Sequence, residues 1–240
     1  LPPGAGAWAT PRSGMVTTWL PGLVPSQLPT QPTARAGTAN GAVPLFGWDT
    51  LDRVLRSREP LDVLTVRGGQ LVAARQPESL AEARALMDFG VSVVVRGSER
   101  HDPGLAALAT AFARELPGEV HVQLYATPGA TNSYGWHYDF EDVFIAQTLG
   151  VKDYYFRENT VARDTVLGDD LDFGVFRQET SPVFTARLVA GDVLHLPARW
   201  WHLVTCAEDA LSISVGVMSP EAQRTARRLP AGWTGGDARG

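Results

Sequence analysis

Apolar residues recur at helical intervals in the first half of the chain. Ser79 and Glu82 have the spacing of a capping box ahead of one such segment, which predicts a helix over residues 79–89. Asp102 and Pro103 have the N-cap and first-turn residue types of a second amphipathic helix. A shorter helix with one apolar face is expected ahead of both.

After Val120 the pattern changes to short β-branched and aromatic runs separated by Gly, Pro and Asp. One further run of this kind lies between the two predicted helices. Together these runs predict strands at residues 91–95, 121–125, 143–148, 153–156, 184–189, 193–196 and 211–217. Many short strands with turn signals between them are typical of a sandwich or barrel. We therefore predict a mainly β fold with flanking helices.

The chain divides into one domain and two flanking segments. Residues 1–42 are rich in Pro, Gly, Ala and Thr, which predicts an extended or disordered arm. Because a methionine stands at Met15, residues 1–14 are a candidate leader or added segment. One folded domain is expected over residues 43–222, with a C-terminal tail at 223–240.

Composition narrows the class of protein. The 240 residues are 44% hydrophobic and 20% charged, enough for one domain with a substantial core. A net charge of −5 with scattered basic residues argues against a nucleic-acid partner. No apolar run is long enough to cross a membrane. The single cysteine, Cys206, cannot form an internal disulfide, which favours a cytoplasmic location.

Two segments carry candidate metal ligands. His137 and Asp139 stand two residues apart, so on a strand both would point to one face. His202, after a hairpin-like turn, is the candidate third ligand. Two His and one carboxylate leave three adjacent positions open, as in non-heme Fe(II) oxygenases, where a 2-oxo acid and O2 can bind. An isolated His-x-Asp pair is often accidental, so the second segment decides the interpretation.

That second segment has Gly191, then Pro197 six residues later and His202 five after that. The spacing resembles the second cupin motif, except that Arg199 replaces its usual glycine. The stretches HYDFEDVFIAQTLGVKDYYF and GDVLHLPARWWHLVTCAEDALSIS together resemble the JmjC-type cupins, especially the ribosomal oxygenase branch, over about residues 46–220. The resemblance implies a double-stranded β-helix (jelly-roll), Fe(II) and 2-oxoglutarate.

The same resemblance implies three residues beside the cosubstrate. Lys152 stands thirteen positions after Asp139, where the family has the basic residue that binds the distal carboxylate of 2-oxoglutarate. Tyr125 and Ser212 are implied as its hydroxyl neighbours, and Gln123 replaces the family's usual Asn. A buried anion needs a cation and hydroxyl donors to offset its desolvation. The alternative for Lys152 is a solvated strand lysine.

The other histidines and the tryptophans near the ligands have plainer interpretations. His195 is interpreted as a core residue or a residue that supports the ligands, in preference to a fourth ligand. His121 and His101 are interpreted as structural residues. The tryptophans near the candidate ligands are Trp136, Trp200 and Trp201. They are interpreted either as core packing or as an apolar lining that excludes water from the reactive centre.

We therefore expect a hydroxylase that acts on a C–H bond, at the β-carbon, in the side chain of a peptide or protein residue. Only about twenty residues follow Pro220, so the C-terminal dimerisation and winged-helix regions of the ribosomal branch are expected to be absent. The compact module resembles stand-alone members, including those that modify ribosomally made peptide natural products. The oligomeric state is not predicted.

Acidic residues suggest a cationic or histidine-containing peptide as the target, if they line one mouth. They are Glu141, Asp142, Glu158, Asp169, Asp170 and Asp172. The alternative is a solvated acidic surface.

Two other functions remain open. One is an oxygenase of the same fold that acts on a free small molecule or uses no 2-oxo acid; Lys152 argues against the latter. The other is a cupin that binds a ligand without catalysis, against which the intact set of metal ligands argues.

Overall fold

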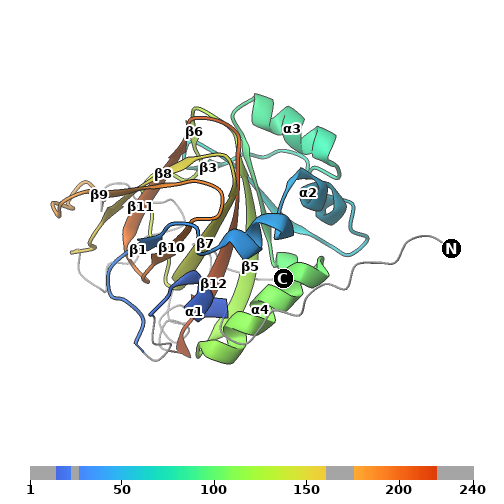
Figure 1. Cartoon of the computed structure of the whole chain (residues 1–240). Helices are drawn as coiled ribbons and strands as arrows, with labels where there is room; N and C mark the ends of the chain where they lie inside the picture. Colours follow the sequence, from blue (N-terminus) through green and yellow to red (C-terminus); the bar gives the residue numbers. More distant parts are fainter. Residues whose placement is uncertain (1–14, 23–26, 161–175, 221–240) are drawn as a thin grey trace.

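The structure is a computed structural model, which describes residues 15–22, 27–160 and 176–220 of the protein. Two antiparallel sheets face each other, and helices α2, α3 and α4 lie on the far side of the larger sheet (Figure 1). The larger sheet has the strand order β1-β10-β7-β12-β5-β4-β2-β3, and the smaller has the order β6-β11-β8-β9. Among the described residues, no helix has the length and apolar character needed to span a membrane.

The elements have the following bounds. The helices are α1 (Met15–Trp19), η1 (Asn40–Leu45), α2 (Trp48–Leu55), α3 (Leu80–Asp88), η2 (Ser98–Arg100) and α4 (Pro103–Glu115). The strands of the larger sheet are β1 (Thr33–Arg35), β2 (Asp62–Arg67), β3 (Gln70–Leu71), β4 (Ser92–Arg96), β5 (Glu119–Thr127), β7 (Asp142–Leu149), β10 (Val193–Leu196) and β12 (Ala210–Met218). Those of the smaller sheet are β6 (Thr131–Asn132), β8 (Lys152–Arg157), β9 (Phe184–Leu188) and β11 (Trp201–Cys206).

The polypeptide moves back and forth between the sheets after residue 142. β7 belongs to the larger sheet, β8 and β9 to the smaller, β10 to the larger, β11 to the smaller and β12 to the larger. This alternation produces the two facing layers of a jelly-roll. The predicted mainly β fold with flanking helices is confirmed.

The predicted helices and strands are present, and their caps explain where the helices start. The Ser79 side chain accepts a hydrogen bond from the backbone N–H of Glu82 at the start of α3. The Asp102 carboxylate accepts bonds from the backbone N–H groups of Gly104 and Leu105 at the start of α4. Five strands were not predicted, β1, β2, β3, β6 and β11, and three of these have three residues or fewer.

Alternation along the strands divides the apolar residues between two cores. On β12, Ile213 and Val215 join the core between the larger sheet and the helices. On β7, Val143 and Ile145 face the other way, into a smaller core between the two sheets. Ser212 and Ser214 alternate with the apolar residues of β12, so this strand presents hydroxyl groups to the space between the sheets.

The expectation of an extended arm is wrong for the part of residues 15–42 that the structure describes. Trp19 and Leu20 are buried in the main core, and the Trp19 ring packs edge-to-face on Phe112 of α4 at 5.2 Å. β1 forms one edge of the larger sheet by pairing with β10. The prediction was wrong because it rested on the average composition of the segment. A few apolar residues in it, such as Trp19 and Leu20, bury enough surface to order it.

Candidate metal and cosubstrate site

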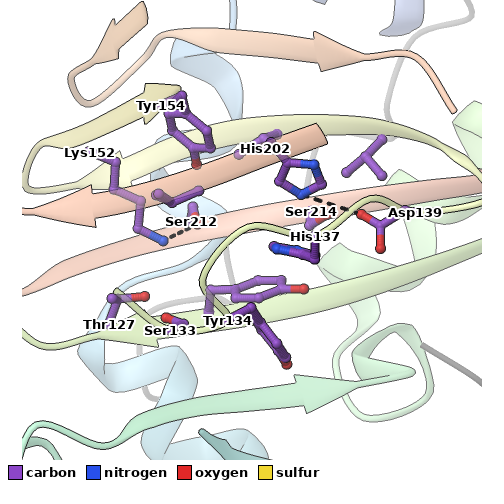
Figure 2. A pocket seen from close by; sticks show the side chains of 14 residues that line it. Thr127, Ser133, Tyr134, His137, Asp139, Lys152, Tyr154, His202, Ser212 and Ser214 are labelled. Atoms are coloured by element: carbon purple, nitrogen blue, oxygen red, sulfur yellow. Dashed lines mark hydrogen bonds and ion pairs between the residues drawn. The ribbon is translucent and has the colours of Figure 1, made fainter. Parts of the chain in front are cut away.

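His137, Asp139 and His202 come together in a cavity between the two sheets (Figure 2). Each offers one ligand atom, and these atoms all lie within 4.8 Å of one another. His202 Nε2 lies 3.6 Å from an Asp139 carboxylate oxygen, and the two imidazole ring centroids are 4.0 Å apart. Within the described residues, this is the group of His, Cys, Asp and Glu side chains placed to hold a metal ion.

Two details of the predicted ligand segments are wrong. His137 and Asp139 do not lie on a regular strand, because His137 forms only an isolated bridge with His202. The backbone N–H of each of these two histidines donates to the carbonyl of the other, at 3.0 and 2.8 Å. β10 and β11 do not form a hairpin, because they belong to different sheets. The ligands are therefore brought together by a contact between a loop and a strand.

The two imidazoles are oriented by hydrogen bonds to backbone carbonyl groups. His137 Nδ1 lies 3.0 Å from the Gly135 carbonyl oxygen, and His202 Nδ1 lies 3.0 Å from that of Trp200. A carbonyl oxygen only accepts, so each Nδ1 donates in these bonds, and Nε2 is the ring nitrogen left to face a metal. Burial and then the neighbouring His202 lower the pKa of His137 to about 4, so it is neutral at physiological pH. Two imidazole nitrogens and a carboxylate fit a divalent transition metal.

Lys152 lies in the same cavity and reaches across it (Figure 2). It is the only lysine of the protein and is 3% exposed. Its Nζ donates to Ser212 Oγ at 2.8 Å and lies 5.6 Å from the centroid of the Tyr125 ring. Burial lowers the pKa of Lys152 to about 8. No carboxylate in the described part of the protein forms an ion pair with it, so the site fits a ligand that brings an anionic oxygen.

Tyr125 and Ser212 line the same cavity, beside Lys152. The Tyr125 hydroxyl donates to the Gln123 side-chain oxygen at 3.0 Å, and the two residues lie on one face of β5. Burial raises the pKa of Tyr125 and of Tyr154 well above the usual range, so both phenols stay neutral hydrogen-bonding groups.

Several residues that line the cavity were not predicted from sequence. They are Thr127, Ser133, Tyr134, Val143, Ile145, Tyr154, Val204 and Ser214. Strand periodicity could have identified three of them, because Thr127, Tyr154 and Ser214 each stand two residues after a predicted cosubstrate residue. Tyr134 lies in the loop before the first ligand, where sequence spacing offers no such guide.

Glu141 and Asp142 contact histidines and do not line the cavity. Glu141 is buried, with a carboxylate oxygen 3.1 Å from His121 Nε2, and Asp142 Oδ1 lies 2.9 Å from Nε2 of the buried His195. His121 and His195 therefore fit the structural role predicted for them. Of the other acidic residues predicted to attract a cationic peptide, Glu158 is exposed and does not line the cavity. Asp169, Asp170 and Asp172 lie outside the described residues.

The three tryptophans near the ligands do not form a wall of the cavity. Trp136 and Trp201 pack with Tyr138 and Phe140 in an aromatic cluster, and Trp200 packs against the core between the sheets. None of the three lines the cavity, so packing is the interpretation that fits.

Gly216 makes room for the pair between His121 and Glu141. A Cβ at this position would lie 2.5 Å from Glu141 Oε1 and 2.5 Å from His121 Nε2. The strand conformation is otherwise ordinary, so close approach explains the glycine. Glu141 follows the candidate ligand Asp139 by two residues, so this pair joins β5 to the chain next to Asp139.

Gly216→Ala is therefore expected to lower the free energy of unfolding by about 1–2 kcal/mol, because the added methyl group separates a buried hydrogen-bonded pair. Urea unfolding measures the change. Gly47→Ala is the matched control, because a Cβ at Gly47 meets nothing within 4 Å. Equal stability of the two variants would contradict this explanation of Gly216.

The fold and the site define a jelly-roll protein with a His, Asp and His cavity of the kind that holds a transition metal. The family model for the JmjC domain matches residues 102–225, slightly more than half of the chain. The chain belongs to the JmjC domain family.

The relatives point to the ribosomal oxygenases. The bifunctional lysine-specific demethylase and histidyl-hydroxylase NO66 of Dictyostelium discoideum is 25% identical over 180 residues, which are 72% of this chain and 35% of that protein. Ribosomal oxygenase 1 of Danio rerio is 24% identical over 184 residues, 73% of this chain and 34% of that protein. The chain thus spans about a third of the length of these relatives.

A solved structure has the same fold. The Escherichia coli ribosomal oxygenase YcfD, in complex with cobalt and 2-oxoglutarate, has a TM-score of 0.56 and 20% identity. The match covers 82% of this chain and 50% of that one. The fold implied by the sequence resemblance is confirmed, and the distant homology covers only the JmjC part of these proteins.

Proposed function

We propose that this protein is an Fe(II)- and 2-oxoglutarate-dependent oxygenase that hydroxylates an unactivated C–H bond. The observation that carries the proposal is the buried Lys152 ammonium, which has no carboxylate partner among the described residues and shares a cavity with the three candidate ligands. A cosubstrate that chelates a metal through one end and carries a carboxylate at the other needs both features together.

Each residue has a defined task in this proposal. His137, Asp139 and His202 would hold the iron, with their Nδ1 and backbone contacts fixing the ring orientations. Lys152 and Ser212, with the Tyr125 ring beside them, would hold the distal carboxylate of 2-oxoglutarate. When bound, the iron supplies the redox chemistry that couples decarboxylation of 2-oxoglutarate and use of O2 to substrate hydroxylation. The protein's own contribution is to position both partners and to exclude water.

The proposed target is a C–H bond, at the β-carbon, in the side chain of a peptide or protein residue. The names of the relatives support this class, since one is a histidyl-hydroxylase and another is a ribosomal oxygenase. A ribosomally made peptide natural product is a target of the same chemistry. A histidine-containing or cationic peptide is therefore the first probe to use.

The test loads metal-free protein with Fe(II) in the absence of oxygen, adds 2-oxoglutarate and air, and measures succinate. The second arm adds synthetic peptides that contain histidine, arginine or neither. We expect slow succinate formation without peptide, faster formation with a suitable peptide, and a mass increase of one oxygen atom on that peptide. Protein loaded with Zn(II) is the control, because zinc occupies such ligands without redox chemistry.

The outcomes separate this proposal from its alternatives. Succinate formation that responds to free amino acids but to no peptide would favour a small-molecule oxygenase. Binding of 2-oxoglutarate without turnover would favour a non-catalytic ligand-binding protein. Failure to bind either the metal or the cosubstrate would refute the proposal.

A further inference from the structure

Arg199 has a backbone conformation that favours glycine. It lies in the turn between β10 and β11 with φ of 71°, in the left-handed region. Among the described residues, only Ala130 shares a positive φ without being glycine. The Cβ of an L-residue is crowded in this region, so glycine would occupy the position at no steric cost. A non-glycine residue that persists in such a place is often held by a functional constraint.

Three contacts join Arg199 to the segment that contains Asp139. Its backbone N–H donates to the Asp139 carbonyl oxygen at 2.7 Å. Its guanidinium carbon lies 5.5 Å from the ring centroid of Tyr138 and 5.8 Å from that of Phe140, within the range of cation–π attraction. Arg199 therefore contacts Asp139 through the main chain and both neighbours of Asp139 through the side chain.

The two aromatic neighbours are buried in a separate cluster and do not line the cavity. Tyr138 and Phe140 are both buried, with ring centroids 5.5 Å apart, and the Tyr138 ring packs edge-to-face on Trp201 at 4.8 Å. Asp139 lies between them in sequence and lines the cavity. Holding the two rings therefore fixes the direction in which the Asp139 carboxylate points.

We propose that Arg199 is a positioning residue that holds the metal ligand Asp139 through Tyr138 and Phe140, and that this task explains why the turn has a strained arginine where glycine would fit. The inference rests on the proposed metal site. It concerns the protein's own residues and can be tested by metal binding without turnover.

The experiment measures Co(II) binding to metal-free protein through the ligand-field absorption of the ion, together with the Tm of the metal-free protein. Arg199→Gly removes the guanidinium that contacts Tyr138 and Phe140, and it relieves the steric strain of the positive φ. We expect Co(II) affinity to fall by about tenfold, the lower end of the range for residues that orient metal ligands. The Tm should stay within about 2 °C of wild type or rise, because relief of strain offsets the lost contacts.

Two further variants of Arg199 separate the effect of its charge from the effect of its backbone conformation. Arg199→Asn tolerates the left-handed conformation without the backbone freedom of glycine, and it should weaken Co(II) binding as Arg199→Gly does. Arg199→Lys keeps a cation over the rings and should retain most of the affinity. Arg84→Ala is the matched control, because it removes the guanidinium that lies 4.0 Å from the Trp48 ring centroid, and it should leave Co(II) affinity unchanged.

Two results would overturn the inference. One is wild-type Co(II) affinity in both Arg199→Gly and Arg199→Asn. The other is a parallel fall of Tm and affinity, which would make Arg199 a general structural residue. Failure of the wild-type protein to bind Co(II) would instead refute the proposed metal site, so the two failures are distinguishable.

Discussion

Asp139→Ala is expected to abolish both metal binding and 2-oxoglutarate turnover while leaving the fold intact. The substitution removes the only carboxylate of the three candidate ligands, and the two remaining imidazoles hold a divalent metal far less tightly. The Asp139 side chain is 32% exposed, so its loss opens no cavity in a core. We expect a loss of metal affinity of at least about 100-fold, since ligand loss exceeds the effect of outer residues.

Metal content measured after loading with Fe(II) or Co(II), together with the circular dichroism spectrum, checks this expectation. Asp153→Ala is the matched control, because that carboxylate is bound by Arg187 outside the cavity. Stoichiometric iron in Asp139→Ala would refute the assignment. Copurification of the wild type with nickel or zinc would not, since the same ligands accept those ions.

Lys152→Ala should weaken 2-oxoglutarate binding by about 2–5 kcal/mol and leave metal affinity nearly unchanged. The loss is large because the cation is 3% exposed and the incoming carboxylate would be left buried without it. Lys152→Met preserves the side-chain volume and should give the same loss, which separates charge from packing. Equal cosubstrate affinity in wild type and both variants would remove Lys152 from the site.

The pH dependence of cosubstrate binding follows from the same residue. The pKa of Lys152 lies at about 8 in the folded protein and at 10.5 for a free side chain. Affinity for 2-oxoglutarate should therefore fall as the pH rises above about 8, because the free protein loses the ammonium. Between these two values the unfolded state holds a proton that the folded state has released, so the stability of the cosubstrate-free protein should rise with pH. Lys152→Met should lack both effects.

A single lysine makes the titration directly observable. Reductive methylation with a ¹³C-labelled reagent places one side-chain NMR signal on Lys152, apart from that of the N-terminus. Its chemical shift should titrate near pH 8 without cosubstrate and at higher pH with 2-oxoglutarate bound, because a carboxylate partner stabilises the ammonium. A titration near pH 10.5 in the free protein would show that the amine is solvated.

Contrary to the prediction, Glu141 and Asp142 do not line a mouth that could attract a cationic peptide. Glu141 and Asp142 are adjacent at the start of β7, so strand geometry sends them to opposite faces, where each meets a histidine from another strand. Those contacts join residues 20 and 53 positions apart, which local patterns do not encode.

Sequence alone determined the elements that depend on local chemistry. Spacing and side-chain type predicted the helix caps at Ser79 and Asp102 and the alternating strands, and the structure has both. The same kind of pattern singled out His137, Asp139 and His202, which the structure brings together. The resemblance to JmjC-type cupins, which rests on two sequence motifs, also indicated Lys152. These features are predictable because hydrogen bonding and strand periodicity act over a few residues.

Only the tertiary structure decided how the site is held. The bridge between His137 and His202 and the burial of Trp19 depend on contacts between distant segments. The left-handed turn at Arg199, which in the sequence is only a departure from a motif, has its explanation in the rings of Tyr138 and Phe140. Local sequence cannot specify such features, because the energy of a strained turn or a buried aromatic ring is balanced by neighbours that the fold alone brings together.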